Sequence, residues 1–130
     1  MNLFEQALCF AAEKHDGQTR KLARIPYILH PVEVAAIVGT MTDDPEILAA
    51  AVLHDTVEDA GVPFEMLKEK FGRRVALLVE TETEDKRSER PAAETWRIRK
   101  EETLLVLQHT KDIGVKMIWL GDKLANMRSF

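Results

Sequence analysis

The feature that most constrains the fold is the helical spacing of apolar residues, as in Leu3, Ala7, Phe10 and Ala11. Ala, Leu, Glu and Lys dominate the chain, and the alternation of β-branched residues that is typical of strands is nearly absent. The 130 residues, of which 45% are apolar, suffice for one domain with its own core. The sequence therefore predicts a single all-α domain, a helical bundle, over residues 1–130.

Turn and cap signals divide the chain into helices. Pro31 suits the first turn of a helix PVEVAAIVGTM, and Asp43-Asp44-Pro45 is typical of a cap followed by a helix-starting proline. The second signal predicts one helix through ILAAAVLHDTVED, which Gly61 ends. Further helices are predicted from the N-terminus to near Gly17, in FEMLKEKFG, in GRRVALLVETE, and over 95–109 and 113–129, with a charged loop TEDKRSERPAAE before the last two.

Net charge and cysteine content limit which cellular compartment and which class of binding partner are expected. The formal net charge is −4, whereas a general nucleic-acid binder is expected to be basic. The single Cys9 supplies no disulfide framework, which fits a reducing cytosol. The N-terminal run lacks the basic start of a signal peptide, and no apolar run approaches membrane-spanning length. We therefore expect a cytoplasmic protein with neither a nucleic-acid nor a membrane partner, although local basic patches leave room for a small phosphorylated ligand.

The stretch LHDTVEDAG places one histidine and three carboxylates beside an apolar segment. Residues four apart share a helix face, so a continuous helix would stack His54 with Glu58 and Asp55 with Asp59. An isolated His-Asp pair is more often the solvated edge of an amphipathic helix. Here apolar residues flank the pair, so part of this turn is expected to enter the core, where an unpaired charge is costly. A metal ion or a buried partner would then be required.

Two further residues can complete such a metal site. His30 follows the apolar Ile28-Leu29, and Asp122 interrupts the run MIWLGDKLANM. Taken singly, a core histidine or a surface aspartate is the more common interpretation. With His54 and Asp55 they supply two imidazoles and two carboxylates, a set that suits a divalent transition metal such as Mn, Fe or Zn with positions left for water.

The order His30, His54-Asp55, Asp122 resembles that of the HD-domain metal-dependent phosphohydrolases. The resemblance extends to the hydrolase domain of the RelA/SpoT homologue family, in particular its small alarmone hydrolases. It rests on four stretches in the family's order that cover roughly half of the chain: GQTRKLARIPYILHPVEVA, AAAVLHDTVEDAG, FEMLKEKFGRRVALLVE and GDKLANMRS. HDTVED is the most specific part, because a lone HD dipeptide would be weak evidence.

The resemblance implies an HD-domain helical bundle that hydrolyses the 3′-pyrophosphate of guanosine tetra- or pentaphosphate, (p)ppGpp, and releases pyrophosphate. It implies Mn²⁺, with other divalent transition metals also suited, bound by His30, His54, Asp55 and Asp122. It implies catalytic roles, in assisting the attacking water, for Glu58 and Asp59. It implies substrate-binding roles for Arg20, Lys21, Tyr27, Lys86 and Asn126.

The chemistry of phosphoryl transfer agrees with these roles. A metal lowers the pKa of its bound water and polarises the phosphoryl oxygen that it touches. Glu58 or Asp59, one predicted turn from the ligands, could orient or deprotonate that water. Cations are needed near the developing charge, and Arg20 and Lys21 lie on the loop that leads to the first predicted ligand. Asn126 follows the last predicted ligand by four residues and is expected on the same helix face.

Three functions stay open from the sequence. The leading one is Mn²⁺-dependent hydrolysis of (p)ppGpp, and a second keeps the metal site but acts on ppApp, NADPH or another phosphorylated nucleotide. The third is a non-catalytic nucleotide sensor, which the complete ligand set and the Glu-Asp pair disfavour. Relatives usually continue with further helices after the last ligand helix, so we expect a domain shortened at Phe130, and the substrate is what the sequence determines least.

Overall fold

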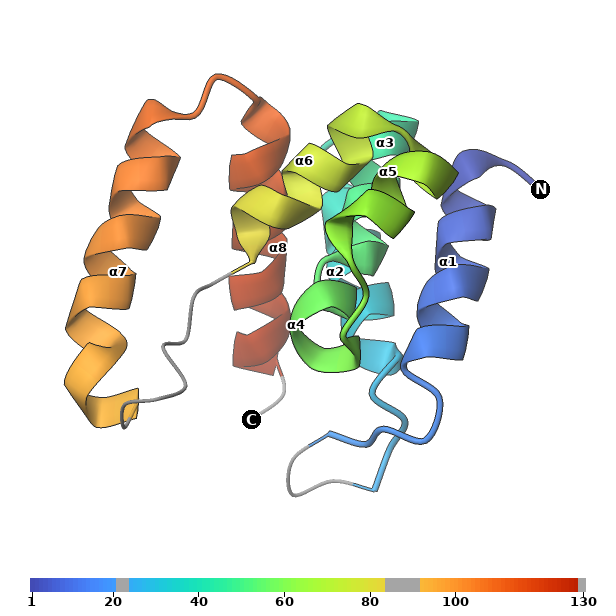
Figure 1. Ribbon diagram of the computed structural model, residues 1–130, viewed down its shortest axis with the longest axis horizontal. Coiled ribbons are helices and arrows are strands. Elements are labelled where there is room, and N and C mark those ends of the chain that lie inside the picture. Colours follow the sequence, from blue (N-terminus) through green and yellow to red (C-terminus); the bar gives the residue numbers. More distant parts are fainter. Residues whose placement is uncertain (21–23, 84–91, 129–130) are drawn as a thin grey trace.

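The computed structural model describes residues 1–20, 24–83 and 92–128, which form helices joined by loops (Figure 1). The helices are α1 (Leu3–Lys14), α2 (Leu29–Val38), α3 (Pro45–Leu53), α4 (Thr56–Ala60), α5 (Phe64–Phe71), α6 (Arg73–Glu82), α7 (Ala92–His109) and α8 (Ile113–Arg128). Within these residues the β-structure amounts to one isolated bridge, between Thr19 and Pro26. The predicted all-α fold is confirmed.

The helices pack around α3, which contacts α1, α2, α6 and α8. Its residues from Ala49 to Leu53 are all fully buried. A helix that is covered on all sides needs no polar face, which explains the uninterrupted apolar run ILAAAVL. The other main contacts join α2 to α8 and α5 to α6, while α7 and α1 lie at opposite edges of the molecule (Figure 1).

The predicted caps of α3 and α4 are confirmed. The side chain of Asp44 accepts a hydrogen bond from the backbone N–H of Glu46 at 3.0 Å, and Pro45 opens the helix. Gly61 ends α4 in the left-handed region, at φ 67°. Helix α2 differs slightly, because it begins at Leu29 and places Pro31 in its first turn. Proline is tolerated there because the first N–H groups of a helix have no partner within the helix.

The prediction of one helix through ILAAAVLHDTVED is wrong, because the chain leaves the helix at His54 and Asp55. The imidazole Nδ1 of His54 donates to the carbonyl oxygen of Ala51 at 2.7 Å. The hydroxyl of Thr56 donates to the carbonyl oxygen of Leu53, also at 2.7 Å. These side-chain bonds satisfy carbonyls at the helix end and compete with its continuation. The expected pairing of Asp55 with Asp59 is kept, because the backbone N–H of Asp59 donates to the carbonyl oxygen of Asp55 at 2.9 Å.

Helix α8 approaches α2 closely through a glycine. Gly121 and Ala125 are buried, whereas Leu120 and Leu124 are 42% and 36% exposed. A Cβ at position 121 would lie only 2.8 Å from Val38 Cγ2 of α2. The missing side chain thus lets the two helices meet, and it brings the next residue of α8 towards the first turn of α2.

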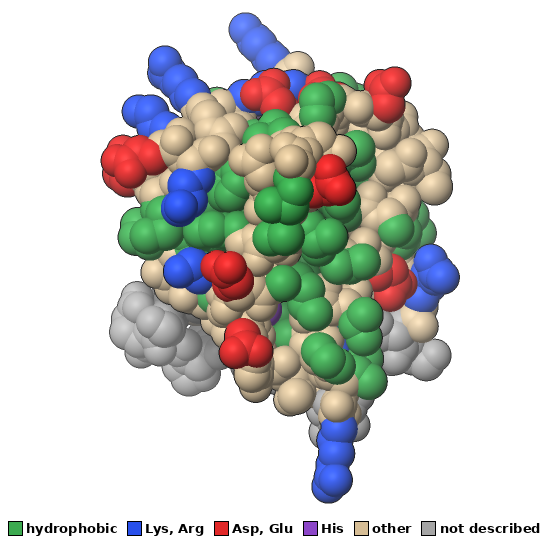
Figure 2. Space-filling view, turned by 90° about the vertical axis from the view of Figure 1, so that its right-hand side faces the viewer, with side chains coloured by type: hydrophobic (Ala, Val, Ile, Leu, Met, Phe, Trp, Pro, Cys, Tyr) green, Lys and Arg blue, Asp and Glu red, His purple; other side chains and the backbone are tan. Residues whose placement is uncertain are grey.

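The surface on the α1 side mixes apolar areas with acidic and basic side chains (Figure 2). This mixture accords with a chain that carries 18 Lys and Arg against 22 Asp and Glu. In the described part of the chain, none of the helices combines the length and the apolar character that a membrane crossing requires.

Candidate metal centre and reaction site

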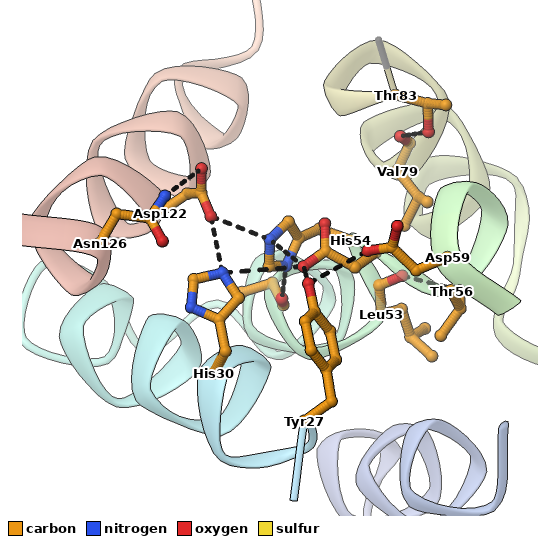
Figure 3. Close-up of polar contacts among 12 residues, drawn as sticks. Tyr27, His30, Leu53, His54, Thr56, Asp59, Val79, Thr83, Asp122 and Asn126 are labelled. Carbon is orange, nitrogen blue, oxygen red and sulfur yellow. Dashed lines mark hydrogen bonds and ion pairs between the residues drawn. The ribbon is translucent and has the colours of Figure 1, made fainter. Parts of the chain in front are cut away.

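The four predicted metal ligands come from three parts of the chain and meet at one point. Figure 3 shows three of them, His30, His54 and Asp122, pointing toward one another. Asp122 Oδ1 lies 2.9 Å from His30 Nε2 and 3.3 Å from His54 Nε2. Asp55 Oδ2 lies 3.1 Å from His54 Nε2 and 3.7 Å from His30 Nε2. Both imidazoles are buried, and both carboxylates are partly exposed. Two nitrogen donors and two carboxylate groups therefore share one small volume.

The orientation of His54 suits metal binding. Because its Nδ1 donates to the carbonyl oxygen of Ala51, the neutral ring carries its lone pair on Nε2, which faces the two carboxylates. Hydrogen bonding at the other ring nitrogen is how proteins commonly orient histidine ligands. The ligand atoms of His30, His54 and Asp122 lie within 4.8 Å of one another. This donor set fits a divalent metal ion.

Electrostatics within the cluster favour ionised carboxylates. Burial raises the pKa of Asp122, but hydrogen bonds with His30 and His54 outweigh burial and hold that pKa well below its usual range. Burial is the largest single influence on the pKa of Asp55 and raises it, but the charge and hydrogen bond of His54, with smaller contributions from Tyr27 and His30, together outweigh burial and lower that pKa. Burial lowers the pKa of His54, yet Asp55 and Asp122 raise it overall. Both carboxylates are therefore ionised near neutral pH, as metal ligands must be.

Tyr27 connects this cluster to the two predicted catalytic acids. Its hydroxyl lies 2.7 Å from Asp55 Oδ2 and 3.1 Å from Asp59 Oδ2, and its single proton can be donated to one of them at a time. Burial, followed by the charges of Asp55 and Asp59, raises the pKa of Tyr27 far above its usual value, so the phenol stays neutral. Carboxylate oxygens of Asp55, Glu58 and Asp59 lie within 4.8 Å of one another. Glu58 and Asp59 therefore adjoin the predicted ligands.

Of the predicted substrate-binding residues, Tyr27 and Asn126 contact the cluster. Asn126 Nδ2 lies 3.4 Å from Asp122 Oδ2, so Asn126 flanks the cluster on α8. Arg20 lies on the loop between α1 and α2, and its backbone N–H donates to the carbonyl oxygen of Ile25 at 3.2 Å. The substrate contact of Tyr27 stays a prediction, since its hydroxyl is engaged by carboxylates. Two others fall outside the described residues: Lys21 and Lys86.

A cavity of about 300 Å³ adjoins the cluster. Its acidic lining includes Asp55, Glu58 and Asp122, and its cationic lining comes from Arg99, Lys100 and Lys123. Apolar groups complete the lining, among them Leu107, Val115 and Trp119. A concave site with apolar walls and a few convergent charged groups is typical of small-molecule binding.

One cavity residue, Glu82, was not predicted as part of the site. It is the last residue of α6 and follows the buried Leu78 and Val79 by four and three positions. These spacings place Glu82 on the buried face of the helix. A carboxyl group in the apolar stripe of GRRVALLVETE was the signal in the sequence that could have identified it.

The family is decided by comparison with known proteins. A model of the HD domain family matches residues 7–130. The chain belongs to the HD domain family. This HD domain is 38% identical over 125 residues to a guanosine-3′,5′-bis(diphosphate) 3′-pyrophosphohydrolase of Aquifex aeolicus, covering 96% of the chain and 17% of that protein. It is 39% identical over 127 residues to the bifunctional (p)ppGpp synthase/hydrolase SpoT of Escherichia coli, covering 95% of the chain and 17% of SpoT.

Solved structures agree with this assignment. The HD domain matches a metazoan ortholog of SpoT that hydrolyzes ppGpp, with a TM-score of 0.84 and 34% identity over 99% of this chain and 70% of that chain. The predicted resemblance to RelA/SpoT hydrolase domains and the HD-domain helical fold are thus confirmed. The chain spans about a sixth of the length of the curated relatives described above, at 17% of each.

Proposed function

We propose that this HD domain hydrolyses the 3′-pyrophosphate of (p)ppGpp, with Mn²⁺ bound by His30, His54, Asp55 and Asp122. The observation that carries the proposal is the convergence of these four groups beside a cavity that is also lined by acids and cations. The substrate is supported by relatives at 38% and 42% identity that are named guanosine-3′,5′-bis(diphosphate) 3′-pyrophosphohydrolase. The preference for Mn²⁺ over Fe or Zn rests on the resemblance of the sequence to this family.

Glu58 and Asp59, beside the proposed metal centre, activate the attacking water. A divalent ion, when bound, supplies a Lewis acid that polarises the phosphoryl group and lowers the pKa of water. Glu58 and Asp59 orient and deprotonate the attacking water, because they adjoin the ligand Asp55. Tyr27 restrains Asp55 and Asp59 through its hydroxyl, so that the water-activating and metal-binding groups keep a common geometry.

The cations of the cavity balance the charge of the substrate. Lys123 lies next to Asp122 in sequence and lines the cavity together with Arg99 and Lys100. Positive groups in these positions stabilise the negative charge that accumulates on the phosphoryl oxygens as the bond breaks. Asn126, beside Asp122 on α8, contacts the nucleoside in this proposal. Three further residues are assigned to substrate by the sequence resemblance: Arg20, Lys21 and Lys86.

A panel of substrates tests the proposed activity. The purified domain is incubated with Mn²⁺ and, separately, ppGpp, ppApp, NADPH and simple nucleotides, and the products are identified by ion-exchange chromatography and mass spectrometry. We expect GDP and pyrophosphate from ppGpp and no turnover when the metal is chelated. Orthophosphate from NADPH alone would overturn the substrate assignment, and stable binding of nucleotides without any turnover would indicate a sensor.

Two variants distinguish the proposed role in metal binding from the proposed role in activating water. Asp55→Ala is expected to lose both bound metal and turnover, because it removes one of the carboxylate ligands. Glu58→Gln is expected to lose turnover while its metal content, measured by elemental analysis, stays at the level of the parent protein. Full activity in Asp55→Ala would show that the metal assignment is wrong.

A further inference from the structure

The buried face of α6 ends in a carboxyl group that the proposed function does not use. Glu82 is partly buried and continues the stripe of the buried Leu78 and Val79, so its side chain lies on the inner face of α6. Its Oε1 atom is buried and has no hydrogen-bond partner among the residues that the structure describes. An unpaired polar atom in a folded interior is costly, and such atoms concentrate where a ligand or a reaction requires them.

The surroundings of Glu82 are those of the reaction site. Glu82 lines the same cavity as His54, Asp55, Glu58 and Asp122, and it therefore faces the space beside the metal centre. Charged groups from three directions face this cavity: His54, Asp55 and Glu58 at the α3–α4 junction, Asp122 and Lys123 on α8, and Arg99, Lys100 and Glu102 on α7. A substrate held between the metal centre and the α7 cations would lie against Glu82.

Burial and the nearby carboxylates keep the carboxyl group of Glu82 protonated in the metal-free protein. Burial raises the pKa of Glu82 to about 8, Asp122 and Asp55 add to this effect, and His54 and Lys123 oppose it. A divalent ion at the centre would lower this pKa, whereas the phosphates of a bound substrate would raise it. Glu82 thus differs from the ligands Asp55 and Asp122, because it has a proton to donate near neutral pH.

The proposed reaction needs such a proton. Attack of water on the phosphorus nearest the ribose forms a new P–O bond and breaks the bond between that phosphorus and the 3′-oxygen. The departing oxygen would be an alkoxide, a strongly basic leaving group, and its departure is assisted by an acid that protonates it as the bond breaks. Glu58 and Asp59 take a proton from the water in the proposed mechanism, so the acid has to be another group.

We propose that Glu82 is a further catalytic residue, the general acid that protonates the ribose 3′-oxygen as pyrophosphate leaves. The proton of the Glu82 carboxyl passes to the 3′-oxygen, the proton of the attacking water passes to Glu58 or Asp59, and exchange with solvent restores both groups. This inference rests on the proposed (p)ppGpp hydrolase activity, and it assigns the leaving-group side of that same reaction.

The test compares Glu82→Gln and Glu82→Asp with the parent protein, and Glu80→Gln, at the exposed neighbouring position on α6, is the matched control. We expect Glu82→Gln to lower kcat for ppGpp by about 10²–10⁴-fold with little change in KM, the scale of general acid catalysis. Glu82→Asp, which retains an acid, should recover part of this loss, and Glu80→Gln should behave as the parent. The parent rate should fall as pH rises through the pKa that Glu82 has with metal and substrate bound, and the residual Glu82→Gln rate should not show this fall.

A readout without turnover completes the test. Carboxyl ¹³C NMR of the metal-free protein, labelled at Glu, should show one group that titrates near pH 8 and is missing from Glu82→Gln. A kcat of Glu82→Gln within threefold of the parent, an unchanged pH profile, or an effect confined to KM would overturn the assignment while leaving the hydrolase proposal intact. A parent protein that is inactive on ppGpp would overturn both.

Discussion

Replacing Gly121 with alanine should separate two helices and weaken metal binding at the same time. The new Cβ would lie 2.8 Å from Val38 Cγ2 and 3.3 Å from the carbonyl oxygen of Val34. Carbon atoms in contact are normally about 3.5–4.0 Å apart, so the first distance is short by about 0.7–1.2 Å. Val38 is fully buried and β-branched, with little rotamer freedom, and the other contact is to backbone. Helix α2 must therefore move away from α8.

The size of the effect follows from this geometry. Overpacking a core by one methyl group costs about 1–3 kcal/mol, and the better helix propensity of alanine offsets about 1 kcal/mol of that. The net loss of up to about 2 kcal/mol corresponds to a Tm lower by up to about 8 °C for a domain of this size. Metal–ligand distances tolerate only about 0.2 Å of error, and Asp122 follows Gly121 directly. We therefore expect metal affinity to fall about 10–100-fold, the scale seen when the support of a metal ligand is disturbed.

Isothermal titration with Mn²⁺ and thermal unfolding of the metal-free protein measure the two effects. Gly114→Ala is the matched control. Gly114 lies on α8, about two turns from Gly121, and a Cβ there would lie similarly close to a neighbouring helix, 2.9 Å from Ile47 Cγ1 of α3. It should lower Tm and leave metal affinity unchanged. If Gly121→Ala bound Mn²⁺ within twofold of the parent, or if Gly114→Ala weakened binding equally, the close approach of α2 and α8 would not be what sets the site.

Three further outcomes are expected. The pKa of Glu82 is about 8 in the folded protein and 4.5 in the unfolded chain, so between these pH values the folded protein binds one more proton than the unfolded chain. The free energy of unfolding therefore falls as pH rises through this range, by up to about 1.4 kcal/mol per pH unit. In calorimetry of the metal-free protein, the Tm of Glu82→Gln relative to the parent should therefore rise from pH 5 to pH 8; a constant difference would contradict the buried, protonated carboxyl. Tyr27→Phe loses the hydroxyl contacts with Asp55 and Asp59. It should lower the free energy of unfolding, measured by urea denaturation, by about 1–3 kcal/mol and should lower kcat for ppGpp. Unchanged stability would argue against these hydrogen bonds. Arg74→Met loses ion pairs with Asp44, Glu46 and Asp112, which solvent partly screens, so we expect a cost of up to about 3 kcal/mol that shrinks in 0.5 M salt while metal affinity is retained. A larger loss that persists in salt would contradict this.

Local signals in the sequence were sufficient for most helices. Asp44-Pro45 and Gly61 act within a few residues of themselves, through a cap bond and a left-handed backbone, so their positions predict the start of α3 and the end of α4. The break at His54 was missed, because it depends on side chains that bond to carbonyl oxygens of the preceding turn, against a strong helical pattern. The residue types of the four proposed ligands could also be predicted from the sequence, because two histidines and two aspartates interrupt apolar runs.

The meeting of those ligands was decided by the tertiary structure. His30 and Asp122 are 92 residues apart, and they touch because Gly121 lets α8 lie against α2. The hydrogen bonds of Tyr27 to Asp55 and the burial of Glu82 likewise depend on which elements pack together. The residue types that can bind a metal or carry a proton are properties of the chain itself. The distances and the pKa values that make those residues a site arise only when packing excludes water and brings distant segments into contact.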